Sequence, residues 1–279
     1  MPRWYVSGWR LGWPGGGHET AGWGSILKDG LYLLLKKILI VGGRGFIGSH
    51  LCAELSAKGY HIHTLSPGNP EKGIPGSLSH HCGDAANAAP LLQSIHPLFS
   101  IVYLAHEGWP GSPGRDQETM DHCLRPFHRF LQAACLKQPK KFVYVSSGGA
   151  VYGNHPEPTL DEGVPLEPVS LYGKIKKQAE AMGQEARQNH GLPFLVARPG
   201  NAYGPGQVPG RGAGFIAAAI AGIRTRIEVP VFGFPGTVRD YLHVRDLVRV
   251  IRLLIESGEV GEAYNLGTGR GSDNRDRKS

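Results

Sequence analysis

The feature that most constrains the fold is a short apolar run that leads directly into a glycine-rich turn. Residues 38–41 have the length and composition of a buried β-strand, and the sequence Gly-Gly-Arg-Gly-Phe-Ile-Gly follows at 42–48. Helical spacing begins within the turn, with Ile47, Leu51 and Leu55 on one face. A strand, a glycine turn and a helix in this order are typical of the first unit of a doubly wound α/β sheet.

Strands and helices alternate along the rest of the chain. Further strands are predicted at 60–65, 101–105, 142–146 and 193–197, and helices at 46–58, 124–136, 171–190 and 242–256. Few hairpin signals occur, so we expect a parallel sheet covered by helices on both faces. The predicted fold class is therefore α/β, a Rossmann-type doubly wound parallel sheet that binds its ligand at the carboxyl ends of the strands.

Composition excludes several functional classes. The chain has 41% apolar and 19% charged residues, as an ordinary globular protein does. Its net charge of +7 is scattered, without a basic run interleaved with aromatics, so an anionic small substrate fits better than nucleic acid. No apolar run approaches the ~20 residues of a membrane span. The 4 cysteines form no C-x-x-C pair, so we predict no metal site and no disulfide framework, and expect a cytoplasmic protein.

Residues of the glycine turn each have a physical role in binding a dinucleotide. Gly42 allows the tight turn, Gly45 lets the backbone approach a phosphate, and Gly48 lets helix and strand pack closely. The first N–H groups of the helix, around Phe46 and Ile47, would then stabilise the pyrophosphate together with the helix dipole. The alternative is a strand-to-helix turn with a structural role alone.

The choice between NAD and NADP depends on the end of the second strand. An acidic residue there would bind the ribose 2′-hydroxyl of NAD, but the position is Ser66. Arg44 could pair with the 2′-phosphate of NADP, or stay solvated while NAD binds. Asp84, after the third strand, could accept from the adenine amino group or simply cap a loop. We expect NAD, with NADP as the alternative, on the family resemblance given below.

Tyr172 and Lys176 supply a candidate proton acceptor. They are one helical turn apart, at i and i+4, in the helix predicted at 171–190. A free phenol has a pKa near 10, and a neighbouring ammonium together with a nicotinamide cation would favour the phenolate. Tyr172 would then act as base or acid on an alcohol or ketone. A core tyrosine beside a solvated lysine is the alternative interpretation.

From residue 36 to about 269 the chain resembles the extended short-chain dehydrogenase/reductases. Within them it is most similar to the NAD-dependent sugar-nucleotide epimerases and dehydratases, the UDP-glucose 4-epimerase-like group. Six ordered segments carry the resemblance: 42–51 (GGRGFIGSHL), 145–153 (VSSGGAVYG), 172–176 (YGKIK), 197–207 (ARPGNAYGPGQ), 239–246 (RDYLHVRD) and 264–269 (YNLGTG). Their order and spacing are specific for the superfamily, and they do not specify one substrate.

The resemblance implies a mechanism and a set of site residues. Tyr172 takes the proton from a sugar hydroxyl while hydride passes to the nicotinamide, and in an epimerase the hydride returns to the other face of the turned sugar. Lys176 would also bind the nicotinamide ribose. Asn201 and Arg239 match positions that contact the phosphates of a nucleotide-sugar substrate; a loop-capping asparagine and a surface arginine are the alternatives. A homodimer built partly from the helix that carries Tyr172 is also implied.

Four regions follow from these predictions. Residues 1–35 hold four of the 5 tryptophans without periodicity, and we expect a poorly ordered extension, or alternatively a dimer-contact arm. Residues 36–195 form the NAD(P)-binding domain. Residues 196–269, rich in glycine and proline, form a smaller substrate-binding lobe interleaved with the sheet. Residues 270–279 form a polar tail without an apolar face, expected to be disordered.

The chain departs from the family pattern in three places. The catalytic serine or threonine of the family falls at Gly148, so we predict that the adjacent Ser147 supplies the hydroxyl instead. His122 or Cys123 stands where a cofactor-side asparagine is common. The family continues beyond the last matching segment, so we expect a truncated substrate lobe.

Two other functions therefore stay open at this point. One is a reductase or dehydratase of nucleotide sugars. The other is a catalytically impaired NAD(P)-binding protein that regulates or scaffolds, which Gly148 and the short end favour.

Overall fold

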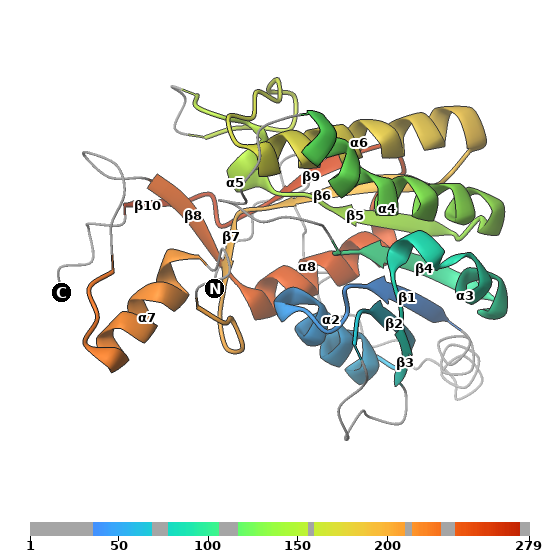
Figure 1. Ribbon diagram of the computed structural model, residues 1–279, viewed down its shortest axis with the longest axis horizontal. Helices are drawn as coiled ribbons and strands as arrows, with labels where there is room; N and C mark the ends of the chain where they lie inside the picture. Colours follow the sequence, from blue (N-terminus) through green and yellow to red (C-terminus); the bar gives the residue numbers. More distant parts are fainter. Residues whose placement is uncertain are drawn as a thin grey trace, which may run out of the picture.

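The computed structural model describes residues 36–68, 78–105, 117–155, 159–209, 214–229 and 238–273. Its centre is a seven-stranded parallel sheet in the order β3-β2-β1-β4-β5-β6-β9 (Figure 1). The strands are β1 (Lys37–Val41), β2 (His61–Ser66), β3 (Leu78–Cys82), β4 (Leu98–Tyr103), β5 (Lys141–Val145), β6 (Phe194–Pro199) and β9 (Ala263–Leu266). The strand order reverses between β1 and β4, which confirms the predicted doubly wound sheet.

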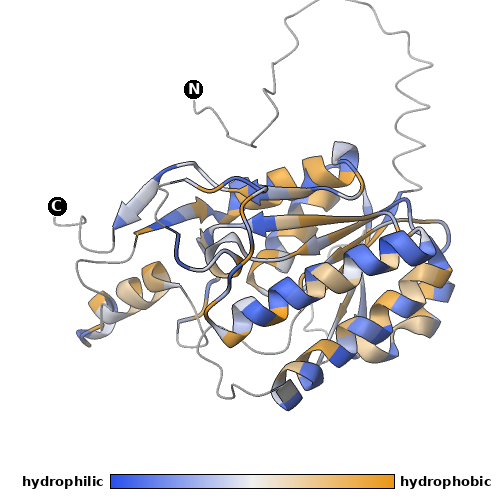
Figure 2. Ribbon diagram, turned by 90° about the horizontal axis from the view of Figure 1, so that it is seen from above, coloured by the Kyte–Doolittle hydropathy of each residue, from blue (hydrophilic) through white to orange (hydrophobic). Residues whose placement is uncertain are grey.

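Helices cover both faces of this sheet, as predicted. On one face lie α2 (Phe46–Ala57) and α8 (Val244–Ser257), which pack against each other. On the other lie α3 (Ala89–Ser94), α4 (Gln117–Lys137) and α6 (Leu171–His190). The ribbons of the outer helices alternate between blue and orange in Figure 2, as expected of helices with one buried face. No helix in the described ranges combines the length and apolarity needed to cross a bilayer.

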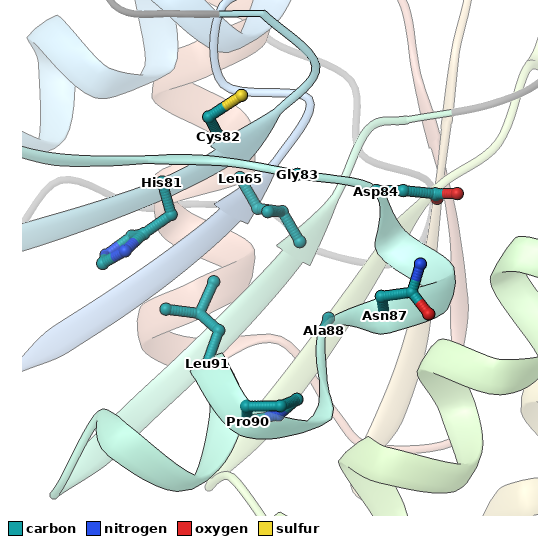
Figure 3. A pocket seen from close by; sticks show the side chains of 9 residues that line it. All are labelled: Leu65, His81, Cys82, Gly83, Asp84, Asn87, Ala88, Pro90 and Leu91. Carbon is teal, nitrogen blue, oxygen red and sulfur yellow. The ribbon is translucent and has the colours of Figure 1, made fainter.

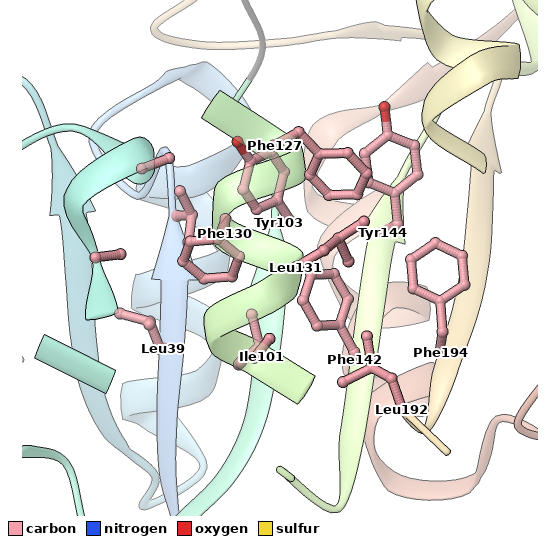
Figure 4. Packing of buried hydrophobic residues seen from close by; sticks show 14 of the residues in the cluster. Leu39, Ile101, Tyr103, Phe127, Phe130, Leu131, Phe142, Tyr144, Leu192 and Phe194 are labelled. Atoms are coloured by element: carbon pink, nitrogen blue, oxygen red, sulfur yellow. The ribbon is translucent and has the colours of Figure 1, made fainter. Parts of the chain in front are cut away.

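Aromatic side chains dominate the core beneath α4. Tyr103 on β4 contacts Phe127 and Phe130 of α4 at centroid distances of 4.7 and 5.1 Å (Figure 4). Phe142 on β5 lies 5.5 Å from Phe194 on β6, and both are fully buried. Such rings bury large apolar areas, so this layer fixes the positions of β4, β5 and β6 relative to one another.

Two glycines let α6 lie close to its neighbours. A Cβ on Gly183 would overlap the ring of Phe194, so the helix meets β6 at a place without a side chain. Near the other end, a Cβ on Gly173 would overlap the carbonyl oxygen of Ala150 and lie 2.8 Å from Cβ of Pro168. Ser170 caps the helix by accepting from Gly173 N–H at 3.1 Å, and Gly191 ends it at φ 67°. The predicted bounds 171–190 are confirmed.

A second, three-stranded sheet in the order β10-β8-β7 lies beside the large one (Figure 1). Its strands are β7 (Asn201–Tyr203), β8 (Val238–His243) and β10 (Gly271–Asp273), with α7 (Phe215–Thr225) near them. The expectation of a disordered tail from residue 270 is wrong for Gly271–Asp273, because these residues pair antiparallel with β8. Backbone pairing of this kind needs no apolar face, so the polar sequence did not reveal it.

The remaining differences from the sequence predictions concern element bounds. Helix α4 begins at Gln117, ahead of the predicted residue 124, and Pro126 lies inside it. Residues 242–243 end β8 and do not begin α8. Residues 1–35, predicted to be a poorly ordered extension, lie outside the described residues.

Candidate active site

The glycine turn lies where β1, β2 and β4 end. The N–H of Gly42 donates to Leu65 O at 2.8 Å, and Gly45 N–H donates to Gly42 O at 3.0 Å. Gly42 has φ 86°, and a Cβ on it would lie 2.9 Å from Ala105 N, so this position requires glycine. A Cβ on Gly48 would overlap Gly42 O and lie 2.7 Å from Cα of Gly43. Contacts of this kind explain the tight packing of turn and helix.

The N-terminal end of α2, the helix that follows the turn, has no side chain capping its N–H groups. Gly45 is the N-cap of α2 and has no side chain to accept from the first N–H groups, at Phe46 and Ile47. No acidic residue stands in the first turn of α2. A diphosphate group fits this end, because free N–H groups and the positive end of the helix dipole both favour an anion.

Arg44 lies over the end of β2. Its Nη1 donates to Gly68 O at 3.1 Å and to Pro67 O at 3.4 Å, and its backbone N–H lies 3.4 Å from Oγ of Ser66. Ser66 is the last residue of β2 and is buried, so the sequence located the strand end correctly. The guanidinium of Arg44 is thus already engaged with backbone carbonyls, which leaves fewer of its donors for a 2′-phosphate.

A pocket opens beside the ends of β2 and β3 (Figure 3). Its volume is about 390 Å³, and Leu65, Asp84 and Leu91 are among the residues that line it. Asp84 caps the short helix at Ala85–Asn87 by accepting from Ala86 N–H at 2.9 Å. One carboxylate oxygen makes this bond, so both roles considered for Asp84, loop cap and adenine acceptor, are compatible with its position.

Tyr172, Lys176 and Ser147 come together at the carboxyl end of β5. Tyr172 is in the first turn of α6, and Ser147 is the residue from which the short helix α5 (Gly148–Val151) starts. The hydroxyl of Ser147 does not cap α5, and a hydrogen bond with its side chain acts on the pKa of Tyr172. Burial raises the pKa of Tyr172 to about 12, and the bond to Ser147 lowers it. The sequence reasoning expected a depressed pKa because it considered charge and left out desolvation.

Lys176 is almost fully enclosed, with 2% of its surface exposed. Its Nζ donates to Val145 O at 2.8 Å and lies 4.9 Å from the ring centroid of Tyr144 and 5.8 Å from that of Tyr172. Burial lowers the pKa of Lys176 to about 7, and the carboxylate of Glu180 raises it. The amino group of Lys176 therefore lies beside the ring of Tyr172, as the spacing predicts, and its charge changes with pH near neutrality.

At Gly148, the position where the family resemblance predicts a serine or threonine, there is no side chain. A Cβ at this position would lie 3.0 Å from Arg198 O and 3.3 Å from Pro199 O, facing the exit of β6. The hydroxyl of Ser147, in contrast, already reaches Tyr172. The prediction that Ser147 replaces the missing hydroxyl is compatible with this geometry.

The two predicted substrate residues lie on the small sheet. Asn201 begins β7, and its Oδ1 would be 2.7 Å from a Cβ on Gly149 of α5, so its amide lies next to the site around Ser147. Arg239 is exposed on β8, two residues from Tyr241, the register partner of Asn201. Asp240 accepts from Thr268 N–H at 2.8 Å and from Gly269 N–H at 2.9 Å, and so holds the loop after β9 against β8.

Sequence reasoning missed a buried polar network below Tyr172 and Lys176. Glu180 accepts from Ser146 Oγ and forms an ion pair with Arg198, whose Nη2 lies 2.7 Å from Oε2. Arg198 also donates to Tyr152 Oη at 2.9 Å. One signal was available: Tyr172, Lys176 and Glu180 continue a single four-residue spacing along α6.

Neither cysteine nor metal chemistry is indicated in the part of the chain that the structure describes. All four cysteines are free, and burial raises the pKa of Cys52 to about 12, so its thiol is inert. Within the described ranges, no group of three or more histidine, cysteine, aspartate or glutamate side chains is arranged to hold a metal ion.

Comparison with known proteins gives a consistent result. The pattern of the family described as "NAD dependent epimerase/dehydratase family" matches residues 38–267. Among curated proteins, the dTDP-glucose 4,6-dehydratase of an Actinoplanes species is 28% identical over 256 residues, 84% of this chain and 77% of that protein. Of other curated relatives, the chain spans between 37% and 69% of the length.

Two solved structures resemble the whole described fold. The UDP-glucose 4-epimerase of Thermotoga maritima, solved with UDP-glucose, is 31% identical, with 85% of this chain and 78% of that chain covered at a TM-score of 0.73. The UDP-glucose 4-epimerase of Thermus thermophilus, solved with NAD, is 29% identical, with 86% and 80% covered at a TM-score of 0.76.

Proposed function

Because the chain belongs to the NAD-dependent epimerase/dehydratase family, we propose that it is a UDP-glucose 4-epimerase-like enzyme that inverts a hydroxyl-bearing carbon of a nucleotide sugar. The NAD dependence of the family agrees with the cofactor expected from the glycine turn. The observation that carries the proposal is the cluster of Tyr172, Ser147 and Lys176 at the end of β5. It lies on the same sheet edge as the glycine turn, where the strands of a doubly wound sheet meet their ligand.

In the proposed reaction Tyr172 takes the proton of the sugar hydroxyl and later returns it. NAD, when bound, supplies the acceptor and donor of hydride. Lys176 in its charged form, with Nζ 5.8 Å from the centroid of the Tyr172 ring, stabilises the phenolate, and Ser147 orients the phenol through their hydrogen bond. The bond with Ser147 thereby offsets part of the burial that raises the pKa of Tyr172.

The binding subsites follow the same edge of the sheet. The N–H groups after Gly45 are suited to the pyrophosphate of NAD, and the pocket lined by Asp84 is suited to its adenine. Asn201 and Arg239, both on the small sheet, are proposed to bind the diphosphate of the nucleotide sugar. A homodimer stays a prediction.

A 4,6-dehydratase is the second candidate, because the Actinoplanes relative has that name. Eliminating water from a sugar requires an acid to protonate the leaving hydroxyl. The segment next to Tyr172 offers none, since residues 148–150 are Gly, Gly and Ala. This favours the epimerase.

The test is incubation of the purified protein with NAD and a panel of UDP- and dTDP-sugars, followed by chromatography and mass spectrometry. An epimerase converts one sugar into another of equal mass, whereas a dehydratase gives a product lighter by one water. Tyr172→Phe, which keeps the ring and removes the hydroxyl, should abolish either conversion. Conversion at the normal rate by this variant, or no conversion of any sugar by the NAD-bound protein, would rule the proposal out.

A further inference from the structure

Two buried hydrogen bonds tie the exit of β5 to α6, and one of them is the bond from Lys176 Nζ to Val145 O at 2.8 Å. The other involves the next residue. Ser146, 3% exposed, donates from Oγ to Oε1 of Glu180, which is 5% exposed. Ser146 directly precedes Ser147, and Glu180 is on the helix that carries Tyr172 and Lys176. The bond therefore joins the two chain segments whose side chains meet in the Ser147–Tyr172 hydrogen bond.

Glu180 is itself held in place from the far side. Nε of Arg198 donates to both carboxylate oxygens at 3.2 Å, and its Nη2 lies 2.7 Å from Oε2. Arg198 is fixed in turn by Tyr152, whose hydroxyl donates to Oδ1 of Asn265 on β9 at 2.7 Å. A carboxylate with this many directed partners in a buried place has little rotational freedom.

We propose that Ser146 and Glu180 are positioning residues that hold the exit of β5 against α6 and thereby set how the hydroxyl of Ser147 meets Tyr172. The inference rests on the proposed role of Tyr172. It concerns Ser147 in particular, because Ser147 carries the one side-chain hydroxyl of the segment 147–150. Without the bond from Ser146 to Glu180, Val145 and the backbone of Ser146 keep their hydrogen bonds to Lys176 and Ala197, but the side chain of Ser146 no longer holds the start of the segment 147–150 against α6.

A double-mutant cycle separates positioning from general support of the fold. Ser147→Ala should lower kcat about a hundredfold, as the loss of one positioned hydrogen bond does. Ser146→Ala should lower kcat about tenfold by misplacing the same bond, with little change in KM. The double variant should be no slower than Ser147→Ala alone, because the tie acts only through that serine. The inference is wrong if Ser146→Ala matches the wild type, or if the two effects multiply.

Ser100→Ala is the matched control. Ser100 is fully buried on β4 and donates to Lys141 O at 3.0 Å, so it has the same chemistry without a link to Tyr172. Its removal should leave kcat unchanged. Glu180→Gln is a second variant that keeps an acceptor for Ser146; it should retain more of kcat than Ser146→Ala if the hydrogen bond matters, and equal loss in all three buried variants would contradict the proposal.

A spectroscopic readout tests the inference without turnover. With 13C at the ζ carbon of tyrosine, the NMR resonance of Tyr172, assigned with Tyr172→Phe, reports the hydrogen bond of its hydroxyl. Ser146→Ala and Ser147→Ala should move this resonance in the same direction, and Ser100→Ala should not. An unmoved resonance in Ser146→Ala would overturn the inference even for an active enzyme. Absent activity with the expected shifts would instead overturn the proposed function alone.

Discussion

Replacing Gly48 by alanine should damage both folding and cofactor binding. The new Cβ would lie 2.7 Å from Cα of Gly43 and 2.8 Å from its carbonyl carbon, and would overlap Gly42 O. These are backbone atoms, so the turn has to move by about 1 Å to restore ordinary contact distances. Overpacking of this kind costs about 3 kcal/mol. Loss of one hydrogen bond to a charged phosphate, about 1.5–3 kcal/mol, weakens NAD binding by about 10- to 150-fold.

The opposite end of the same helix offers the control. Gly59, just after α2, has φ 82°, and a Cβ on it would meet nothing within 4 Å. Gly59→Ala should therefore cost about 1–2 kcal/mol through backbone strain alone. Urea denaturation gives the unfolding free energies, and fluorescence titration with NADH gives the affinities. Gly59→Ala should lose stability and keep its affinity; wild-type affinity in Gly48→Ala, or an equal loss in both variants, would refute the reasoning.

Three further predictions concern charged side chains. Fluorescence titration should show tighter binding of NADH than of NADPH, and Arg44→Ala should change NADH binding by less than about threefold, because the guanidinium already bonds to Gly68 O; much tighter NADPH binding that Arg44→Ala abolishes would reverse the cofactor assignment. Glu180→Leu should cost about 3–5 kcal/mol in urea denaturation by leaving Arg198 buried without a counter-charge, and adding Arg198→Met should recover part of it; a double variant less stable than the single one would contradict this. Burial lowers the pKa of Lys176 from 10.5 to about 7, so the unfolded chain binds more protons than the folded one between these two values. The stability of the wild type should therefore rise with pH across that window relative to the stability of Lys176→Met. A stability difference between the two proteins that does not change between pH 7 and 10 would exclude this pKa shift.

Local patterns made the cofactor half of the molecule predictable. The strand, the glycine turn and α2 are contiguous in the chain, and their packing depends on residues within that stretch, such as Gly42 and Gly48. The bounds of α6 were predictable for the same reason, since Ser170 and Gly191 cap it locally.

Contacts between distant residues could not be read in the same way. The ion pair of Glu180 with Arg198 joins a helix to a strand 18 residues further on, and Ser146 reaches Glu180 across 34 residues. The polar strand Gly271–Asp273 exists because β8 offers it a pairing edge. The pKa of Tyr172 also depends on how much protein surrounds it, which spacing along one helix does not reveal.

The close packing of α6 at Gly173 and Gly183 has a consequence for how a substrate is handled. Phe194 packs directly against Gly183, and Ala150 and Pro168 pack directly against Gly173. These close contacts near both ends of α6 prevent the helix from sliding along its neighbours. The phenol of Tyr172, which this helix carries, is accordingly fixed in position. In the proposed epimerase reaction, a sugar therefore has to rotate in front of a fixed phenol, and the space for this rotation has to come from the strands and loops on the other side of the site.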